Sequence, residues 1–266
     1  MDSYNPLAIW RRFLAQPIDS RGKTILVAFL VSASCAALVS GATVFLRPIQ
    51  MANRAAEQAA RLEALLSAVP GMDQILTGLG DGELTTVVVD LDTGKAASGI
   101  APNQLQAALE GPENWTTLAP ERDVAEIGSR PNYAQVYFLR EGGEVALAIL
   151  PIFGSGYGGT IEAMIALRGD MNTIAGLTVT THSETPGLGA RIEEPAWLLS
   201  FAGKQIADDT GAVRFAVARA QSSGVHEVDG ISGATRTGNA ITRIVRFWLG
   251  PDGFGPLMQA VRRGEY

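Results

Sequence analysis

The most informative stretch of this chain is residues 229–237, which read Asp-Gly-Ile-Ser-Gly-Ala-Thr-Arg-Thr. Gly233 permits turn conformations closed to other residues, and Ala234 adds little bulk, so we expect the Thr235 hydroxyl to be exposed. Apolar residues at helical spacing follow, and Gly250-Pro251 ends the pattern. The unpaired N–H groups and the dipole of a helix start both favour an anion. The sequence therefore predicts a threonine hydroxyl at a place that stabilises phosphate.

A second stretch, residues 184–189, reads Glu-Thr-Pro-Gly-Leu-Gly. Its proline fixes one φ angle and its glycines permit tight turns, so Thr185 and Leu188 can be presented to a flat ring system. Backbone N–H and C=O groups would meet the polar edge of such a ring. We expect Glu184 to anchor the loop rather than touch the ring. In isolation the same pattern is typical of a surface turn.

The two stretches together resemble the domain that binds FMN covalently. Residues 156–159 (Gly-Tyr-Gly-Gly) and Trp197 also fall where that domain has counterparts. The resemblance implies that a flavin transferase joins FMN through its phosphate to Thr235, with Ser232 and Thr237 as secondary candidates. The other residues implied to surround the cofactor are Gly233, Ala234, Glu184, Thr185, Gly187, Leu188 and Tyr157.

Residues 24–46 contain no charged side chain. As a helix they would span about 35 Å, enough for a hydrocarbon core of about 30 Å. A cleaved signal peptide is the alternative, but its apolar core would be shorter. Small residues give this helix a surface that favours packing against partner helices.

The charges beside this span indicate its orientation. Residues 1–23 carry four basic and two acidic side chains, which gives +2, whereas the whole chain carries −6. Basic residues also follow the span (Arg47, Arg54 and Arg61), so the bias is not one-sided. We expect a cytoplasmic N-terminus and a periplasmic main domain, in a single-pass protein of the bacterial inner membrane. The acidic balance argues against a nucleic-acid partner.

Other kinds of site find little support. Cys35 is the single cysteine, so the chain offers no disulfide, iron–sulfur or zinc motif. Cys35 is expected to be a packing residue, with a place near a metal cluster of partner subunits as the alternative. The histidines, His182 and His226, do not form a hydrolase triad with Ser232, because no nucleophile-elbow pattern surrounds that serine. Residues 154–159 do not match the dinucleotide fingerprint.

The hydrophobic pattern predicts an α+β fold in which an antiparallel sheet carries packed helices. The expected strands are residues 85–90, 134–139, 144–150, 161–167, 174–180 and 213–218. The expected helices are residues 48–66 (a stalk), 104–109, 195–202 and one that begins near Thr235. The expected divisions are a cytoplasmic segment (1–23), a transmembrane helix (24–46), a membrane-proximal region with the stalk (47–140), the FMN-binding domain (141–256) and a C-terminal tail (257–266).

Over almost its whole length the chain resembles the C subunits of the sodium-translocating NADH:quinone oxidoreductases, most clearly in residues 156–256 and 21–61. His182 is similar to a residue of the related G subunit of the ferredoxin:NAD oxidoreductase complex. That subunit stays an alternative, as does a non-catalytic anchored flavoprotein that serves as a sensor or assembly factor.

The resemblance to the C subunits implies a six-subunit membrane complex. Electrons from NADH would pass through this FMN to a second covalent flavin in a membrane partner and then to ubiquinone, with export of sodium. The chain would be an enzyme only as a subunit.

Overall fold

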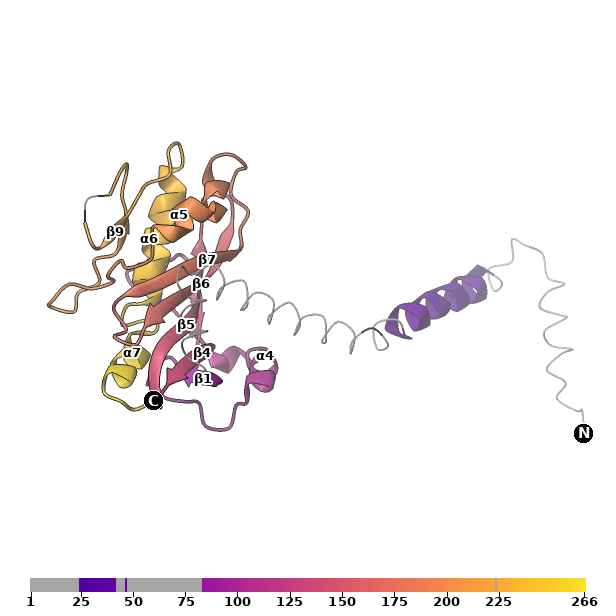
Figure 1. Ribbon diagram of the computed structural model, residues 1–266. Coiled ribbons are helices and arrows are strands. Elements are labelled where there is room, and N and C mark those ends of the chain that lie inside the picture. Colours follow the sequence, from indigo (N-terminus) through magenta and orange to yellow (C-terminus); the bar gives the residue numbers. More distant parts are fainter. Residues whose placement is uncertain (1–23, 42–45, 47–82, 223) are drawn as a thin grey trace, which may run out of the picture. The chain divides into compact units, whose positions relative to one another are not determined.

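The structure is a computed structural model that describes residues 24–41, 46, 83–222 and 224–266. The chain divides into two units, Met1–Ala60 and Arg61–Tyr266, which are considered separately. In the first unit, Thr24–Gly41 forms an apolar helix with a mean hydropathy of 2.1 (indigo in Figure 1). By length and composition this helix fits a single membrane crossing. The expected stalk at 48–66 lies outside the described residues.

The second unit is built on a five-stranded sheet (Figure 1). Its strands follow the order β1-β4-β5-β6-β7, and all neighbours are antiparallel. The strands are β1 (Glu83–Asp90), β4 (Tyr133–Glu141), β5 (Glu144–Ser155), β6 (Thr160–Arg168) and β7 (Ile174–Thr181). Two hairpins, β4–β5 and β6–β7, lie where the sequence predicts them. The sheet includes residues on both sides of the boundary expected at residue 140.

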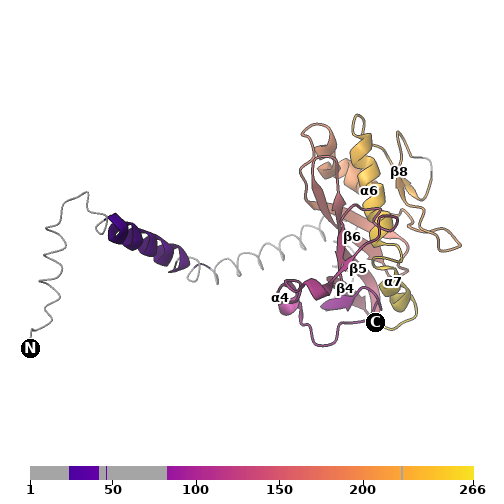
Figure 2. The ribbon, with the colours of Figure 1, turned by 180° about the vertical axis from the view of Figure 1, so that it is seen from behind.

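Two helices of the C-terminal part pack against the sheet. Helix α6 (Thr235–Trp248) lies against β5, as Figure 2 shows from behind, and α7 (Gly255–Arg262) follows it. Trp248, Phe138 and Phe254 are fully buried in the main core, which side chains of the sheet and both helices form. The α+β class with an antiparallel sheet and packed helices is confirmed.

Short elements cover the rest of the described chain. The helical ones are η1 (Pro102–Gln104), α4 (Leu105–Ala108), η2 (Pro112–Asn114), η3 (Gly189–Glu193) and α5 (Pro195–Leu199). Two small sheets add β2 (Trp115–Thr117) paired with β3 (Ser129–Pro131), and β8 (Ala216–Val217) parallel to β9 (Glu227–Val228).

Three expectations need correction. The strand expected at 213–218 is reduced to β8, because the N–H groups of Arg214 and Phe215 both donate to the carbonyl of Ile206 and the ladder cannot continue. The stretch 111–130, in which the sequence predicts no strand, contains β2 and the start of β3. The expected tail contains most of α7, because Pro256 stands in the first turn, where it starts a helix instead of ending one.

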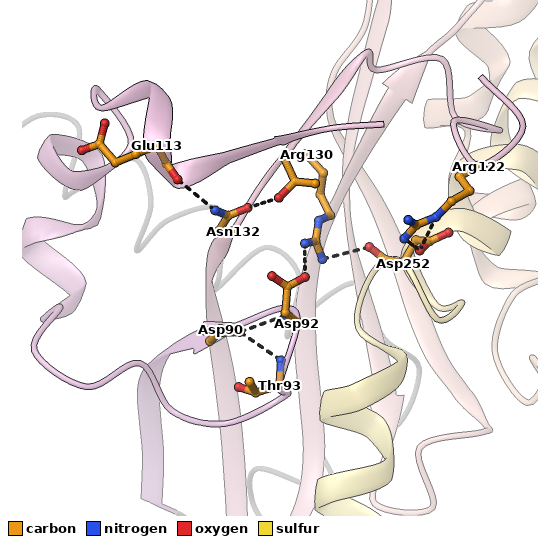
Figure 3. A network of polar contacts seen from close by, with 9 residues as sticks. Asp90, Asp92, Thr93, Glu113, Arg122, Arg130, Asn132 and Asp252 are labelled. Carbon is orange, nitrogen blue, oxygen red and sulfur yellow. Dashed lines mark hydrogen bonds and ion pairs between the residues drawn. The ribbon is translucent and has the colours of Figure 1, made fainter. Parts of the chain in front are cut away.

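A polar network joins residues 90–132 to the loop between α6 and α7 (Figure 3). The buried guanidinium of Arg130 forms an ion pair with Asp92 and donates to the carbonyl of Asp252 at 3.1 Å. Arg122 binds the Asp252 side chain from the solvent side. Residues 92–130 and residue 252 are therefore held together as parts of one fold.

Candidate functional site

The turn before α6 presents an exposed hydroxyl. Gly233 adopts φ 79°, a left-handed conformation that glycine takes at little cost. Ala234 is the N-cap, and the exposed Thr235 is the first helical residue. Thr235 is therefore not the N-cap of the helix. The first backbone bond of the helix runs from Gly238 N–H to Ala234 O, so the N–H groups of residues 235–237 precede the helical ladder.

The electrostatics of this helix start favour an anion. The first turn of α6 contains no acidic residue. Its second residue, Arg236, places its guanidinium 5.1 Å from the ring centre of Tyr157. The positive end of the helix dipole, the free N–H groups and this guanidinium each stabilise a negative charge at the helix start.

The three candidate hydroxyls differ in access. Ser232 and Thr235 are exposed. Thr237 is 2% exposed, and its hydroxyl donates to Glu184 Oε2 at 2.6 Å. Burial and this bond make the Thr237 hydroxyl less accessible than those of Ser232 and Thr235.

The carboxylate of Glu184 joins the three stretches that the sequence singles out. It is 4% exposed, and its Oε1 accepts the backbone N–H groups of Tyr157 at 2.7 Å and Gly158 at 2.9 Å. Its Oε2 accepts the Thr237 hydroxyl in the first turn of α6. Glu184 thus anchors its loop from inside, and both of its carboxylate oxygens accept hydrogen bonds from the protein.

An exposed apolar side chain lies beside the turn that carries Thr235. Leu188 is 46% exposed, and a methyl group added to Gly233 would lie 3.1 Å from its Cδ2. The carbonyl of Thr185 accepts the N–H groups of Leu188 and Ala190, which closes the loop. Gly187 lies at the exposed tip with φ 74°. Leu188 is therefore presented next to the turn that carries Thr235.

The histidines serve other contacts. His182 Nδ1 accepts the N–H of Glu184 at 3.0 Å, and its Nε2 lies 2.9 Å from Glu193 Oε1. His226 Nδ1 lies 3.1 Å from the carbonyl of Gln205. In the part of the chain that the structure describes, neither ring has a recorded contact with Ser232, so nothing assembles a hydrolase triad.

Two contacts fix the strand that enters the turn. The indole N–H of Trp197 donates to the carbonyl of Asp229 at 2.8 Å. The N–H of Ser222 donates to Asp229 Oδ1 at 2.7 Å, and this bond lowers the pKa of the carboxyl below its ordinary value. Asp229 is thus a fixed structural carboxylate at the entrance of the turn.

Sequence reasoning missed several partners in the site. It did not pair Glu184 with Thr237, His182 with Glu193, or Arg236 with Tyr157. These pairs lie 53, 11 and 79 residues apart, and no spacing rule joins loops at such separations. An acid directly before a turn-forming loop was the signal available for Glu184.

Comparisons with known proteins agree with this geometry. The family described as FMN-binding domain matches residues 156–250. The C subunit of the Na+-translocating NADH-quinone reductase of Yersinia pestis is 35% identical over 253 residues, which cover 92% of this chain and 95% of that protein. Its counterpart in Vibrio alginolyticus is 35% identical, and the match covers 95% of this chain and 99% of that protein.

A solved structure gives the same result. The crystal structure of NqrC from Shewanella oneidensis aligns with a TM-score of 0.65 and 30% identity, and the match covers 78% of this chain and 99% of that one. With an exposed threonine in an FMN-binding domain and relatives matched over nearly their whole length, this chain belongs to the family of C subunits of the Na+-translocating NADH-quinone reductases.

Proposed function

We propose that this chain is the FMN-carrying C subunit of a Na+-translocating NADH-quinone reductase, with the phosphate of FMN joined to the Thr235 hydroxyl. The observation that carries the proposal is the exposed Thr235 at the start of α6, with Thr237 buried beside it. Three unpaired N–H groups and a first turn without acids suit a phosphodiester there.

The residues around Thr235 fit the rest of the cofactor. The exposed side chain of Leu188 offers apolar contact to a ring, and Tyr157 offers an aromatic face now covered by Arg236. Ser232, Gly233 and Ala234 shape the phosphate side, and the loop at Thr185 and Gly187 presents backbone groups. Bound FMN supplies electron-transfer chemistry, whereas the protein binds it, orients it and sets its potential.

Membership of the family supports a place for this subunit in electron transfer. Bound FMN would accept electrons that originate from NADH at another subunit and would supply them to a second covalent flavin in a membrane partner and then to ubiquinone. Residues 24–46 contain no acid or base, so this chain provides no sodium pathway of its own. A flavin transferase attaches the FMN, because no acid or base among the described residues is hydrogen-bonded to the Thr235 hydroxyl.

The apolar helix defines the proposed topology. It crosses the bacterial inner membrane once, with the basic residues 1–23 in the cytoplasm and the flavin domain in the periplasm.

Fluorescence on a denaturing gel tests the attachment. The full chain, produced with a flavin transferase, is expected to give a fluorescent band and the mass of one attached FMN. Thr235→Ala is expected to lose both signals, whereas Ser232→Ala, also an exposed hydroxyl of the same turn, keeps them. A label that survives Thr235→Ala and disappears in Ser232→Ala would move the attachment to Ser232.

A further inference from the structure

The bonds of the Glu184 carboxylate give it a more specific role than that of a loop anchor. Two consecutive backbone N–H groups, of Tyr157 and Gly158, point at one oxygen, and the Thr237 hydroxyl points at the other. The first pair fixes the turn that carries the Tyr157 ring. The second bond fixes the first turn of α6. One buried side chain therefore connects the ring side of the site to its phosphate side.

The backbone approaches this carboxylate closely on two sides. A Cβ atom on Gly156 would collide with Glu184 Oε1, and one on Gly189 would collide with Glu184 Oε2 and lie 2.7 Å from Thr237 Oγ1. Both glycines thus stand where the backbone approaches the carboxylate too closely for any side chain. Glu184 and Thr237 are held in a single arrangement by close packing as well as by their bond.

The helix transmits this arrangement to Thr235. At 3.6 residues per turn, residues two positions apart in the sequence are separated by about 200° around the helix axis. Thr235 and Thr237 therefore lie on opposite sides of α6. Thr237 is buried against Glu184, and Thr235 is exposed. Any rotation of the first turn would break the buried bond and turn the Thr235 hydroxyl away from its position. The Glu184–Thr237 bond therefore sets the direction of that hydroxyl.

We propose that Glu184 and Thr237 form a positioning pair that presents the Thr235 hydroxyl and the Tyr157 turn in one fixed geometry for flavin attachment. Each polar atom of the two side chains is hydrogen-bonded within the protein, so both act through their neighbours. The inference rests on the proposed attachment of FMN to Thr235. It adds two residues that determine how fast the flavin is attached and how its ring is oriented.

The test measures the initial rate at which a flavin transferase labels the purified full chain. Thr237→Val removes the hydroxyl at nearly constant volume and is expected to lower this rate about tenfold, a factor that corresponds to about 1.4 kcal/mol. Thr237→Ser keeps the hydroxyl and is expected to restore the rate. Glu184→Gln keeps the side-chain volume but weakens the charge-assisted bonds, and its rate is expected to fall between those of the wild type and Thr237→Val.

Thr242→Val is the matched control. Thr242 lies on the same helix, where its hydroxyl accepts the Val217 N–H and donates to the Gly238 carbonyl, away from Glu184. Loss of the Thr242 hydroxyl is expected to lower the melting temperature of the protein and to leave the labelling rate unchanged. The visible circular dichroism of the attached flavin, which reports ring orientation, should change in Thr237→Val and Glu184→Gln but not in Thr242→Val.

Three results would overturn the positioning role. Thr237→Val and Glu184→Gln could both give the wild-type rate and dichroism, or Thr242→Val could slow labelling as much as Thr237→Val does. If Thr237→Val fails to fold, a wild-type labelling rate and dichroism in Glu184→Gln would by themselves overturn the positioning role. A wild-type chain that takes no label at Thr235 would instead overturn the proposed function, so the two failures are distinct.

Discussion

The buried guanidinium of Arg130 forms an ion pair with the exposed carboxylate of Asp92, 38 residues earlier in the chain (Figure 3). The same guanidinium donates to the carbonyl of Asp252 in the loop after α6. The residues before the family's FMN-binding domain are thus connected to the end of the flavin-site helix. This contact concerns the stability of the whole fold and not the chemistry of the site.

Arg130→Gln should destabilise this fold. The substitution removes the ion pair with Asp92 and the bond to the Asp252 carbonyl from a side chain that is 4% exposed, and we expect the free energy of unfolding to fall by about 1–3 kcal/mol. Arg122→Gln is the control, because Arg122 binds the same Asp252 from an exposed position and surface pairs contribute little. Urea unfolding of the full chain measures the free energy of unfolding of both variants. Equal effects of the two substitutions would contradict the distinction between the buried and the exposed arginine.

The C-terminal tyrosine should make stability fall in alkali. The Tyr266 hydroxyl donates to the Gly94 carbonyl at 2.9 Å, and burial, with the nearby Glu265, raises its pKa to about 12 from 10.0. In the unfolded chain the phenol ionises near pH 10. Between pH 10 and 12 the unfolded state therefore binds fewer protons than the folded state, and stability falls as the pH rises.

Tyr266→Phe isolates this contribution, since all other groups titrate alike in both proteins. The difference in unfolding free energy between the wild type and Tyr266→Phe should be constant below about pH 10 and shrink between pH 10 and 12. A difference that stays constant up to pH 12 would show that the tyrosine pKa is the same in both states.

The proposed topology is tested with reporters fused after Tyr266. A reporter that is active only after export should work there, and one that matures only in the cytoplasm should stay dark. A fusion directly after Lys23, ahead of the apolar helix, should give the opposite pattern. The reverse result at Tyr266 would place the flavin domain in the cytoplasm.

Local patterns predicted most of the sheet, because the alternation in β4 and the long apolar runs of β5 and β6 reflect burial directly. Helix α7 was not predicted, because Gly255-Pro256 is typical both of a helix end and of a helix start, and only packing decides between them. The polar strands β2 and β3 carry no periodic signal over three residues each. In the site, residues 229–237 predicted an exposed threonine at a helix start, but the burial of Thr237 depends on a glutamate 53 residues away.

Leu188→Asp should change the flavin's potential without preventing its attachment. Leu188 lies beside Gly233 and is 46% exposed, so in the proposed site its side chain would offer contact and water exclusion to the ring, whereas the phosphate would be held at residues 232–235. A carboxylate there disfavours the added negative charge of the reduced ring, and the midpoint potential should fall by tens of millivolts. A one-electron shift of about 60 mV corresponds to about 1.4 kcal/mol.

Leu84→Asp adds the same charge at a similarly exposed leucine on β1, at the opposite edge of the sheet from β7, and should leave the potential unchanged. Redox titration of the labelled proteins compares them, and a wild-type potential and spectrum in Leu188→Asp would mean that the loop lies away from the ring.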